Sequence, residues 1–500
     1  MYRIFGPPGT GKTTRLLDMV DKALSVGIRP ERIGFLAFTR KASIEARERA
    51  SKRFNLDPEK DLFYFRTIHS LAFHSLDIKT TQLMQKTHFE ELSEKIGIHL
   101  TIQKIDADID NLETAVSTSP ILTLINLARL KKSSLRQEYD ESVIDVPWHE
   151  IDYVNRSYLN YKHINGVFDY TDLLEKFVKE QNACPKFDVC FLDEAQDLCN
   201  LQWDIAELLD QNSRRFFCAG DDDQAIYKFA GANIQKFIHM EGGSDTLEQS
   251  YRIPSQVHHL AEEVVTRISD RFPKSYLPRE EKGSVFRRSG IEQIDMSQDS
   301  WLIMGQANYM LNPIVSELKS RGVLFERNGQ RSISDKLSTA VNGWEGLRKG
   351  KSITVDTAQT IFNYMSGNNI KIKRGFKRIK AMDTETLDLS KLKTNYGLLA
   401  TENQIWHEAM DKIPDSERVY ITALLRSGEK FNAKPRIKVS TIHGAKGGEA
   451  ENVILFTDLS TSALESVNDD LHRVFYVGVT RTKKNLYLME PEDTYRSYLL

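Results

Sequence analysis

A glycine-rich stretch near the start of the chain has the residue types and spacing of a phosphate-binding loop. Gly6–Thr13 reads Gly-Pro-Pro-Gly-Thr-Gly-Lys-Thr and fits the pattern G-x-x-x-x-G-K-[ST]. It follows a short predicted strand, Tyr2–Phe5, and precedes an amphipathic helix predicted over Thr14–Leu24. In that context backbone N–H groups surround phosphate oxygens at a helix N-terminus, where partial positive charge accumulates. The sequence therefore predicts a nucleoside triphosphate site.

The chemistry of the loop residues predicts individual roles. Lys12 would reach the β- and γ-phosphates, and the Thr13 hydroxyl would bind Mg²⁺. The predicted ATP contacts of this segment are Gly6, Pro7, Pro8, Gly9, Thr10, Gly11, Lys12, Thr13, Thr14 and Arg15. Because many classes of enzyme share a phosphate loop, the rest of the chain must discriminate between them.

Two further predicted strands end in residues that suit nucleotide hydrolysis. Phe187–Leu192 is a buried strand of the parallel type, and it leads into Asp193 and Glu194. Asp193 would hold Mg²⁺ through water, and Glu194 would polarise the attacking water as general base. Arg215–Ala219 leads towards Gln224, whose amide can contact both the γ-phosphate and the attacking water. Together these residues predict an ATPase site at one edge of a parallel sheet.

The distance along the chain between Lys12 and Asp193 exceeds what a compact nucleotide-binding core needs. Residues 77–165 lie in this interval, are helical in pattern, and are rich in Lys, Glu, Asp and Ser. We therefore expect them to form a helical accessory insertion.

Composition bounds the class of protein. The chain has 500 residues, and 40% hydrophobic and 28% charged residues are globular values that exclude general disorder. Its length suggests three or four domains. The four cysteines exclude a disulfide scaffold and indicate buried thiols in a reducing compartment. No apolar run is long enough to span a membrane, and we expect no signal peptide. The net charge of −2 first argues against nucleic acid, but an aromatic-lined groove needs no overall basic excess.

Nine segments now stand in a known order, and the chain resembles superfamily 1 helicases of the UvrD/Rep/PcrA type along its whole length. The segments that carry the resemblance are Gly6–Thr13, Ala37–Ala42, Thr67–Ala72, Phe168–Leu174, Asp193–Asp197, Gly220–Tyr227, Leu247–Arg252, Ser440–Gly447 and Tyr476–Arg481.

The resemblance implies an α/β fold with two RecA-like P-loop NTPase domains, in which helices flank parallel sheets and accessory insertions are mainly helical. ATP would lie between the two domains and single-stranded DNA would cross both. The expected first domain is 1–76 with 166–246, interrupted by the insertion 77–165. The expected second domain is 247–328 with 434–500, interrupted by a reduced accessory domain at 329–433. The strand candidates of the second RecA-like domain are Trp301–Met304, Ile437–Ser440, Val453–Phe456 and Leu486–Met489.

The resemblance also assigns residues at the nucleotide that spacing alone does not. Arg252 and Arg481 are the expected arginine fingers, supplied to the γ-phosphate from the second domain. Tyr251 would stack on the adenine, and Glu449 would contact the ribose. This assignment implies that hydrolysis depends on domain closure.

The residues expected at single-stranded DNA likewise come from the resemblance. Bases would stack on Phe38, Tyr227 and Phe229, and the DNA backbone would lie near Thr39, Arg40, His69, Thr441 and His443. Taken one by one, the aromatic residues would more often belong to a core, and the histidines to a surface.

The sequence departs from the family pattern at two places. Ala230 stands where the family usually has an arginine, which puts one strand contact in doubt. The family also carries an adenine-reading glutamine upstream of the phosphate loop, and only five residues precede Gly6. We therefore expect weaker discrimination of ATP from other nucleoside triphosphates.

A basic run in the second accessory region allows two interpretations. Lys371–Lys380 holds six basic residues in ten, which is typical of a solvated face but also suits contact with duplex phosphates. The short chain after Arg481 leads us to expect no appended nuclease domain.

These observations predict an ATP-dependent single-stranded DNA translocase and helicase, with the 3′–5′ polarity that the resemblance implies. The alternatives are the ATPase subunit of a helicase–nuclease complex, a DNA-binding scaffold with little motor activity, and, more weakly, an RNA substrate. The expected cofactors are ATP and Mg²⁺, and the expected partners are single-stranded DNA, single-strand–duplex junctions, and replication or repair proteins. We expect a monomer in the cytoplasm of a bacterial or phage-infected cell, and the compact accessory regions would suit a phage-encoded helicase.

Overall fold

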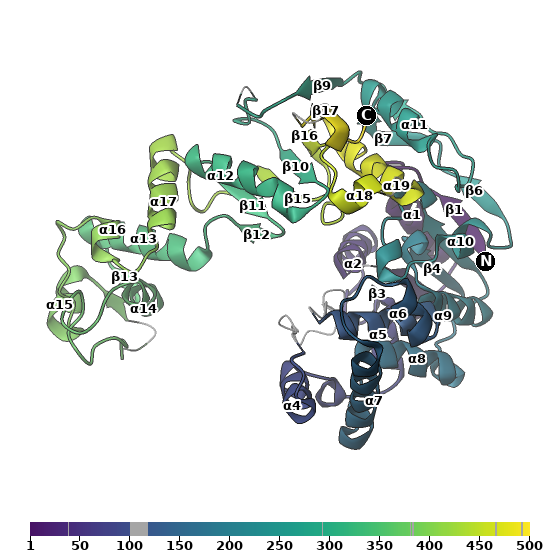
Figure 1. The fold of residues 1–500 in the computed structure, drawn as a ribbon, viewed down its shortest axis with the longest axis horizontal. Helices are drawn as coiled ribbons and strands as arrows, with labels where there is room; N and C mark the ends of the chain where they lie inside the picture. Colours follow the sequence, from purple (N-terminus) through teal and green to yellow (C-terminus); the bar gives the residue numbers. More distant parts are fainter. Residues whose placement is uncertain are drawn as a thin grey trace. The chain divides into compact units, whose positions relative to one another are not determined.

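The chain forms two compact units in the computed structural model. The structure describes residues 1–38, 40–100, 119–292, 294–380, 382, 385–465, 468–491 and 494–500. Unit 1 comprises Met1–Lys282 with Val467–Thr480, and unit 2 comprises Gly283–Ser466 with Arg481–Leu500. Each unit has a sheet of its own, and Figure 1 labels many of the helices and strands.

Unit 1 is built on a parallel sheet with the strand order β3-β2-β4-β5-β1-β6. Its central strands are buried along their whole length, which explains why they are continuous apolar runs without the alternation of a half-exposed sheet. The strands are β1 (Tyr2–Phe5), β2 (Ile33–Ala37), β3 (Phe65–Thr67), β4 (Val189–Asp193), β5 (Phe216–Gly220) and β6 (Ser244–Thr246).

Helices pack against both faces of this sheet. One core contains residues of α1 (Lys12–Ser25) and α2 (Arg40–Phe54), including Leu16, Leu17 and Ala46. The core on the other face contains residues of α3 (Ile68–Ser75), α8 (Tyr170–Lys179), α9 (Asn200–Gln211) and α10 (Ile234–Ile238). Unit 1 is therefore a three-layer α/β domain of the predicted class.

The predicted insertion 77–165, between β3 and β4, is mainly helical in the part that the structure describes, as expected. It contains α4 (Lys86–Ile96), α5 (Pro120–Lys131), α6 (Leu135–Glu141) and α7 (Trp148–Asn165). These helices share their own hydrophobic core, in which Ile151 and Val154 of α7 are fully buried. Residues 101–118 of the predicted insertion lie outside the described residues.

A buried ion network joins this insertion to α8. Lys162 of α7 contacts Asp169 at 2.5 Å and Asp172 at 2.8 Å, and Arg129 of α5 contacts Asp169 at 2.7 Å. The Tyr158 hydroxyl donates to Asp169 at 2.8 Å. Burial works to raise the pKa of Asp169, but the charges of Arg129 and Lys162 outweigh it and lower the pKa. The network therefore holds Asp169 ionised inside the unit.

Unit 1 is completed by the chain that follows β6 and by one segment distant in sequence. The first contains α11 (Ser255–Val265) and the two-stranded sheet of β7 (Gln249–Pro254) and β8 (Leu277–Arg279), and the second is α19 (Asp469–Val479). Residues 247–282 and the α19 segment, which were expected in the second domain, pack with unit 1.

Unit 2 has a larger sheet of its own, with the order β12-β11-β15-β10-β16-β17-β9. This sheet is mixed, since it is parallel except between β11 and β12. Four of these strands match the predicted ones within a few residues: β10 (Trp301–Gly305), β15 (Ile437–Thr441), β16 (Ala450–Phe456) and β17 (Thr482–Met489). The others are β9 (Ser284–Arg288), β11 (Phe325–Arg327) and β12 (Gln330–Arg331), and the helices nearby in sequence are α12 (Asn312–Ser320) and α18 (Thr461–Glu465).

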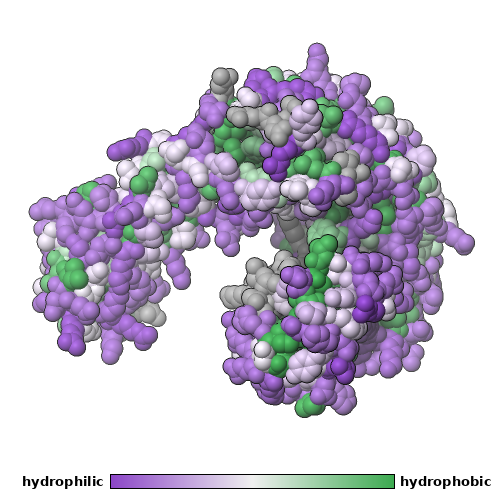
Figure 2. All heavy atoms as spheres, in the orientation of Figure 1, coloured by the Kyte–Doolittle hydropathy of each residue, from purple (hydrophilic) through white to green (hydrophobic). Residues whose placement is uncertain are grey.

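The accessory region of unit 2 is a small helical assembly with one short antiparallel two-stranded sheet. Its elements are α13 (Asp335–Arg348), β13 (Ile353–Thr354), α14 (Val355–Asn363), β14 (Thr386–Leu387), α15 (Leu389–Asn395), α16 (Trp406–Ala409) and α17 (Asp415–Ser427). Trp344 is fully buried in a core that continues into β10. The face of this region seen in Figure 2 is mostly hydrophilic.

Two further expectations from the sequence concern membrane spans and the cysteines. None of the helices in the described ranges combines the length and the apolar character that a membrane crossing needs. Cys184, Cys190, Cys199 and Cys218 are free and buried, as predicted, and burial raises the pKa of each thiol.

Replacing Lys162 by Met should destabilise the protein by about 3 kcal/mol, because Asp169 and Asp172 would keep only Arg129 as a buried counter-charge. The measurement is urea denaturation followed by circular dichroism. The matched control is Lys86→Met, which breaks an exposed i,i+4 pair with Glu90 in the same insertion and should cost less than about 0.5 kcal/mol. Equal effects of the two variants would contradict the stabilising role of the network.

Candidate nucleotide and nucleic-acid site

The phosphate loop joins the carboxyl end of β1 to the N-terminus of α1, as predicted. The Thr10 hydroxyl donates to the Pro7 carbonyl at 2.8 Å, and the Lys12 ammonium donates to the Gly6 carbonyl at 2.9 Å. Gly11 precedes the helix in the left-handed region, with φ of 79°. The loop therefore carries its lysine folded over the backbone that would surround the phosphates.

Strand β7 contacts the loop from within the same unit. The Ser250 hydroxyl donates to the Pro8 carbonyl at 2.8 Å, and the Tyr251 N–H donates to the Gly9 carbonyl at 2.9 Å. A Cβ at Gly9 would lie 2.4 Å from the Arg252 Cβ, so the close approach requires glycine there. Arg252 thus lies beside the loop in unit 1, and Tyr251 has a side chain that is 74% exposed.

The predicted Mg²⁺ ligands are neighbours. The Thr13 hydroxyl donates to Asp193 Oδ2 at 2.8 Å, which brings the first turn of α1 to the end of β4. Burial, reinforced by the charge of Glu194, raises the pKa of Asp193 to about 6, against the opposing effects of Lys12 and Thr13. A hydroxyl and a buried carboxylate in contact at a phosphate loop are a donor set that fits Mg²⁺.

Glu194 is held in an uncommon backbone conformation. Its φ of 57° lies in the left-handed region, which costs a non-glycine residue about 1 kcal/mol or more. Its carboxylate accepts a hydrogen bond from the Gln196 amide at 2.5 Å. The chain therefore leaves the extended conformation of β4 at Glu194, and Gln196 holds the carboxylate of this predicted general base.

Gln196 is a site residue for which the sequence predicted no role. Its side chain is fully buried, its amide nitrogen donates to Glu194, and its amide oxygen accepts from the Asp221 N–H at 3.0 Å. A Cβ at Gly220 would lie 2.5 Å from that oxygen, so β5 must end in glycine. Gln196 thus links the ends of β4 and β5, and only its place beside Glu194 could have indicated this.

Gln224 lies in a short 3₁₀ turn, Asp222–Gln224, directly after β5. Its amide donates to Asp221 Oδ2 at 2.6 Å, and its side chain is buried. The predicted γ-phosphate residue and the predicted general base therefore belong to adjoining loops, joined through Gln196 and Asp221.

The three predicted base-stacking residues lie together although they come from two motifs. The rings of Phe38 and Tyr227 are 5.7 Å apart between centroids, and those of Tyr227 and Phe229 are 6.1 Å apart. Phe229 is 68% exposed, and Phe38 and Tyr227 are half-buried. An exposed aromatic ring backed by two others provides a surface on which a base can stack.

The other unit 1 residues predicted at DNA differ in their surroundings. Arg40 begins α2, and its side chain is half-buried. His69 is half-buried in α3, where burial lowers its pKa to about 4. His69 is therefore a neutral hydrogen-bonding group at physiological pH. Thr39 lies outside the described residues.

The remaining predicted residues belong to unit 2. Arg481 is buried and donates to the Gly448 carbonyl at 3.5 Å, and Glu449 forms an ion pair with Lys483. Thr441 ends β15 and accepts a hydrogen bond from the Gly444 N–H, and His443 lies in the following turn.

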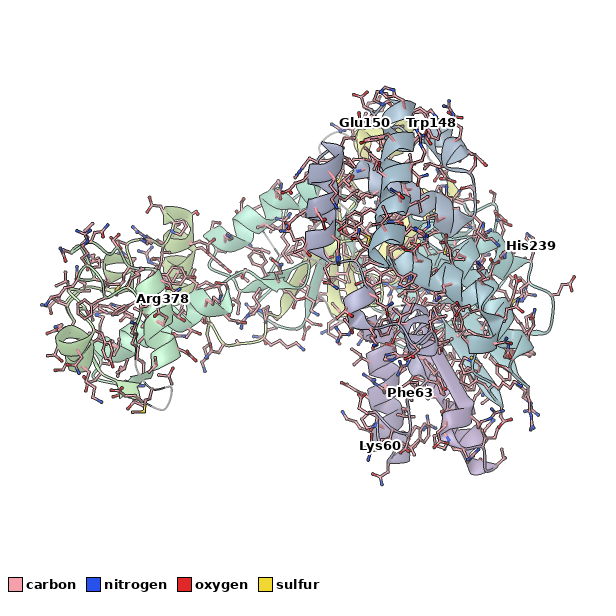
Figure 3. All side chains as sticks on the ribbon, turned by 90° about the horizontal axis from the view of Figure 1, so that it is seen from below. Lys60, Phe63, Trp148, Glu150, His239 and Arg378 are labelled. Carbon is pink, nitrogen blue, oxygen red and sulfur yellow. The ribbon has the colours of Figure 1, made fainter. Side chains whose placement is uncertain are left out.

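The basic run of the accessory region is only partly available at the surface. The Lys377 ammonium donates to the carbonyls of Phe362 and Met365, the second at 2.6 Å, and burial lowers its pKa. Its exposed basic residues are Lys373, Arg374, Arg378 and Lys380, and Figure 3 labels Arg378 in this region. The run thus combines one structural lysine with a solvated basic face.

The fold and this site define a P-loop NTPase with a parallel sheet, acidic and amide groups at its carboxyl edge, and an aromatic cluster in the same unit. Comparison with family models is consistent with this class. Residues 2–243 match the UvrD/REP helicase N-terminal domain, and residues 437–489 match the UvrD-like helicase C-terminal domain. Together the two matches cover more than half of the chain, which belongs to the UvrD/Rep helicase family.

Individual relatives have low sequence identity but extensive coverage. The chain is 22% identical to the ATP-dependent DNA helicase Rep of Buchnera aphidicola, over 97% of this chain and 91% of that protein. It is 24% identical to a probable DNA helicase II homolog of Mycoplasma genitalium, over 97% and 82% of the two chains. It is also 24% identical to the ATP-dependent DNA helicase PcrA of Leuconostoc citreum, over 67% of this chain and 46% of that one.

Replacing Phe229 by Ala should weaken single-stranded DNA binding by about 1–3 kcal/mol, because one stacking surface is removed. The measurement is fluorescence anisotropy with a labelled oligothymidylate. Phe63→Ala is the control, since Phe63 is 38% exposed in the same unit and lies outside the aromatic cluster. Wild-type affinity of the Phe229 variant would show that bases do not stack there.

Proposed function

We propose that the chain is an ATP-dependent translocase on single-stranded DNA that unwinds duplex DNA with 3′–5′ polarity. The observation that carries the proposal is the presence, in unit 1, of a complete phosphate loop, the Asp193–Glu194 pair and an exposed aromatic cluster. Membership of the UvrD/Rep helicase family and the names of the relatives support it.

Hydrolysis would use the residues at the carboxyl edge of the unit 1 sheet. Thr13 and Asp193 would hold Mg²⁺, which when bound neutralises phosphate charge. Glu194 would accept the proton of the attacking water, and Gln224 would orient that water against the γ-phosphate. Lys12 would leave the Gly6 carbonyl for the phosphate oxygens, and Tyr251 would stack on the base.

The two proposed arginine fingers differ in their place in the chain. Arg252 belongs to unit 1 and contacts the loop strand directly, whereas Arg481 belongs to unit 2. Arg252 would therefore contribute its charge without any movement between units, and the dependence of hydrolysis on domain closure would rest on Arg481.

Track binding would rely on stacking more than on charge. Phe38, Tyr227 and Phe229 supply ring surfaces, and the neutral His69 supplies a hydrogen-bonding group without a fixed charge. A translocase must release single-stranded DNA in every cycle, and contacts made mainly by stacking allow this in a chain whose net charge is −2. The DNA role of Arg40, Thr441 and His443 belongs to the same proposal.

The proposed setting is the cytoplasm of a bacterial cell, with single-strand–duplex junctions as substrate and a monomer as the acting form. The similarity to helicases of bacteria supports the setting. The main alternative is the ATPase subunit of a helicase–nuclease complex, which would need a partner to unwind DNA.

The experiment that tests the proposal uses purified full-length chain with ATP, Mg²⁺ and partial duplexes that carry either a 3′ or a 5′ single-stranded tail. We expect unwinding of the 3′-tailed duplex only. Unwinding of the 5′-tailed duplex would overturn the polarity. DNA-stimulated ATP hydrolysis without any unwinding would favour the subunit alternative, and no hydrolysis would favour the scaffold.

Lys12→Ala and Glu194→Gln should both abolish turnover, with Glu194→Gln lowering kcat by about 10²–10⁴-fold while ATP remains bound. Phosphate release and equilibrium binding of a fluorescent ATP analogue measure the two effects. The matched control is Glu150→Gln on α7, outside the nucleotide site, which should hydrolyse ATP normally. Normal hydrolysis by either site variant would refute the site assignment.

Replacing Lys373, Arg374, Arg378 and Lys380 by Gln should weaken duplex binding and make its dependence on salt shallower, by about 0.9 in the log–log slope for each phosphate that is no longer neutralised. Lys377 is left intact because it caps backbone carbonyls. Lys349→Gln with Lys351→Gln is the control on the same accessory region. An unchanged salt slope in the fourfold variant would identify the run as a solvated face.

A further inference from the structure

The segment Arg271–Tyr276, between α11 and β8, belongs to none of the motifs that carry the family resemblance. In unit 1 it nevertheless contacts the turn after β5 and the end of β1. Its basic residues meet the three consecutive aspartates Asp221, Asp222 and Asp223, and we call these three with Arg271 and Lys274 the Lys274 cluster.

Lys274 is the centre of this cluster. Its ammonium lies 3.2 Å from Asp221 Oδ1, 2.6 Å from Asp222 Oδ1 and 2.6 Å from Asp223 Oδ2. Its side chain is 2% exposed, and those of the aspartates are 0–1% exposed. Arg271 binds both oxygens of Asp223, at 2.8 and 2.7 Å.

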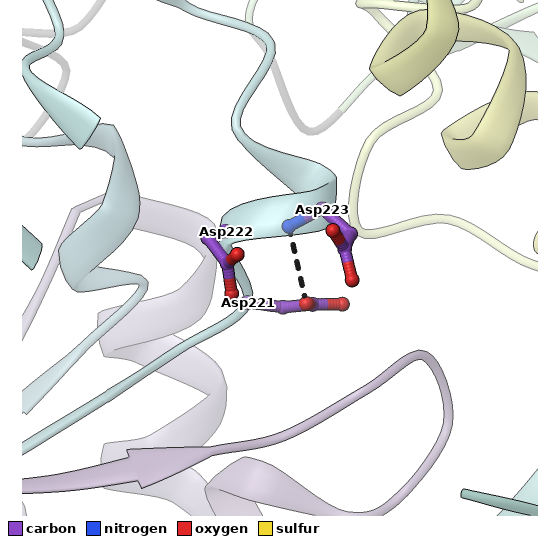
Figure 4. Close-up of side chains that lie close together, drawn as sticks. All are labelled: Asp221, Asp222 and Asp223. Carbon is purple, nitrogen blue, oxygen red and sulfur yellow. Dashed lines mark hydrogen bonds between the residues drawn. The ribbon is translucent and has the colours of Figure 1, made fainter. Parts of the chain in front are cut away.

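The three carboxylates, shown in Figure 4, are close enough together to suit a metal ion, with ligand atoms within 4.8 Å of one another. The ammonium of Lys274 already contacts every one of them, and a fixed cation removes the reason for a metal. The cluster is therefore an internal ion network.

Burial makes the cations necessary. Three adjacent carboxylates buried without counter-charge would lose their hydration with no cation to replace it. Burial, opposed by Lys274, raises the pKa of Asp222 to about 6. At Asp223 burial also works to raise the pKa, but Arg271 and Lys274 outweigh it and lower the pKa. The Phe272 N–H adds a 2.7 Å hydrogen bond to Asp222.

Asp221 connects this network to the nucleotide site. One of its oxygens lies against Lys274, and the other accepts the Gln224 amide at 2.6 Å. Its backbone N–H donates to Gln196, whose amide holds Glu194. Lys274 therefore reaches the predicted γ-phosphate residue through a single shared carboxylate.

The same segment is anchored on the strand that carries the phosphate loop. The Phe272 ring stacks on Phe5, with centroids 4.0 Å apart and planes 8° apart. Phe5 is the last residue of β1, directly before Gly6. Arg473 of α19 donates to the Asp222 carbonyl at 3.1 Å, which fixes the turn from a second side. The position of Gln224 relative to the phosphate loop thus depends on the segment Arg271–Tyr276.

We propose that Lys274 is a positioning residue for ATP hydrolysis, which holds Asp221 so that its carboxylate orients the Gln224 amide towards the γ-phosphate. Arg271 supports it by holding Asp223. This inference rests on the proposed function of Gln224. The ion pairs of Lys274 within the described part of the chain are with the three aspartates, and not with the phosphate loop or the predicted Mg²⁺ ligands. Its effect should therefore be on the rate of hydrolysis and not on ATP binding.

The test is a double-mutant cycle with Lys274→Met, Gln224→Ala and the double variant, in the full-length chain. We expect Lys274→Met to lower the kcat of DNA-stimulated ATP hydrolysis by about tenfold or more, with the KM for ATP within about twofold of wild type. In the Gln224→Ala background the same change should lower kcat less than about twofold, because its effect passes through Gln224. The inference would be overturned if Lys274→Met lowered kcat by the same factor with and without Gln224→Ala. A normal kcat for Lys274→Met alone would also overturn it.

Lys162→Met is the matched control, since it also removes a buried lysine that pairs with two aspartates in unit 1, away from Gln224. It should melt lower but keep its kcat below the transition. A similar loss of kcat in this control would show that destabilisation alone explains the result. If Lys274→Met does not fold, Lys274→Gln, which also removes the charge, takes its place in the same cycle, with the same two outcomes.

Failure of the proposed function has a different signature. A normal kcat for Gln224→Ala would remove the γ-phosphate role itself. A low kcat for Gln224→Ala combined with a normal kcat for Lys274→Met would leave that role intact and reject only the positioning by Lys274.

Discussion

Burial of acidic groups at the carboxyl edge of the unit 1 sheet is the constraint on which the rest of this site depends. Asp193 and the three aspartates after β5 are buried there and lose hydration, and Glu194 beside them is half-buried. The molecule offsets the cost with hydroxyl, amide and ammonium donors from distant segments. The result is a preorganised edge in which the groups that would hold metal, water and phosphate are already oriented.

Much of the fold was predictable because parallel strands that are covered on both faces are continuous apolar runs, which can be recognised in the sequence. β1, β4 and β5 are mainly apolar runs that lead into the phosphate loop or into acidic residues, and the structure places each within two residues of its predicted position. The chain length between Lys12 and Asp193 predicted an insertion, and the described part of it is helical. What the patterns did not indicate was the packing of 247–282 and of α19 with unit 1, because packing partners leave no local signature.

The candidate site also contains residues that the sequence predicted and residues that it did not. Thr13 contacts Asp193, and Phe38, Tyr227 and Phe229 contact one another, so the motifs that placed them in the same predicted sites also bring them together in space. Composition misled at Lys377, because a lysine in a basic run can turn inward to backbone carbonyls. Gln196 and the segment after α11 were missed, since their importance consists of contacts with residues far away in the chain.

The sequence by itself determined the chemistry of this protein: a phosphate loop between a strand and a helix, carboxylates after a buried strand, and the order of motifs shared with UvrD/Rep helicases. The loop and the carboxylates depend on residues within a few positions of one another, whose geometry local backbone structure dictates. Only the tertiary structure decided which cations balance the buried aspartates and which residue orients Gln224. Such compensation depends on long-range packing, and many residues in the chain could have supplied the charge.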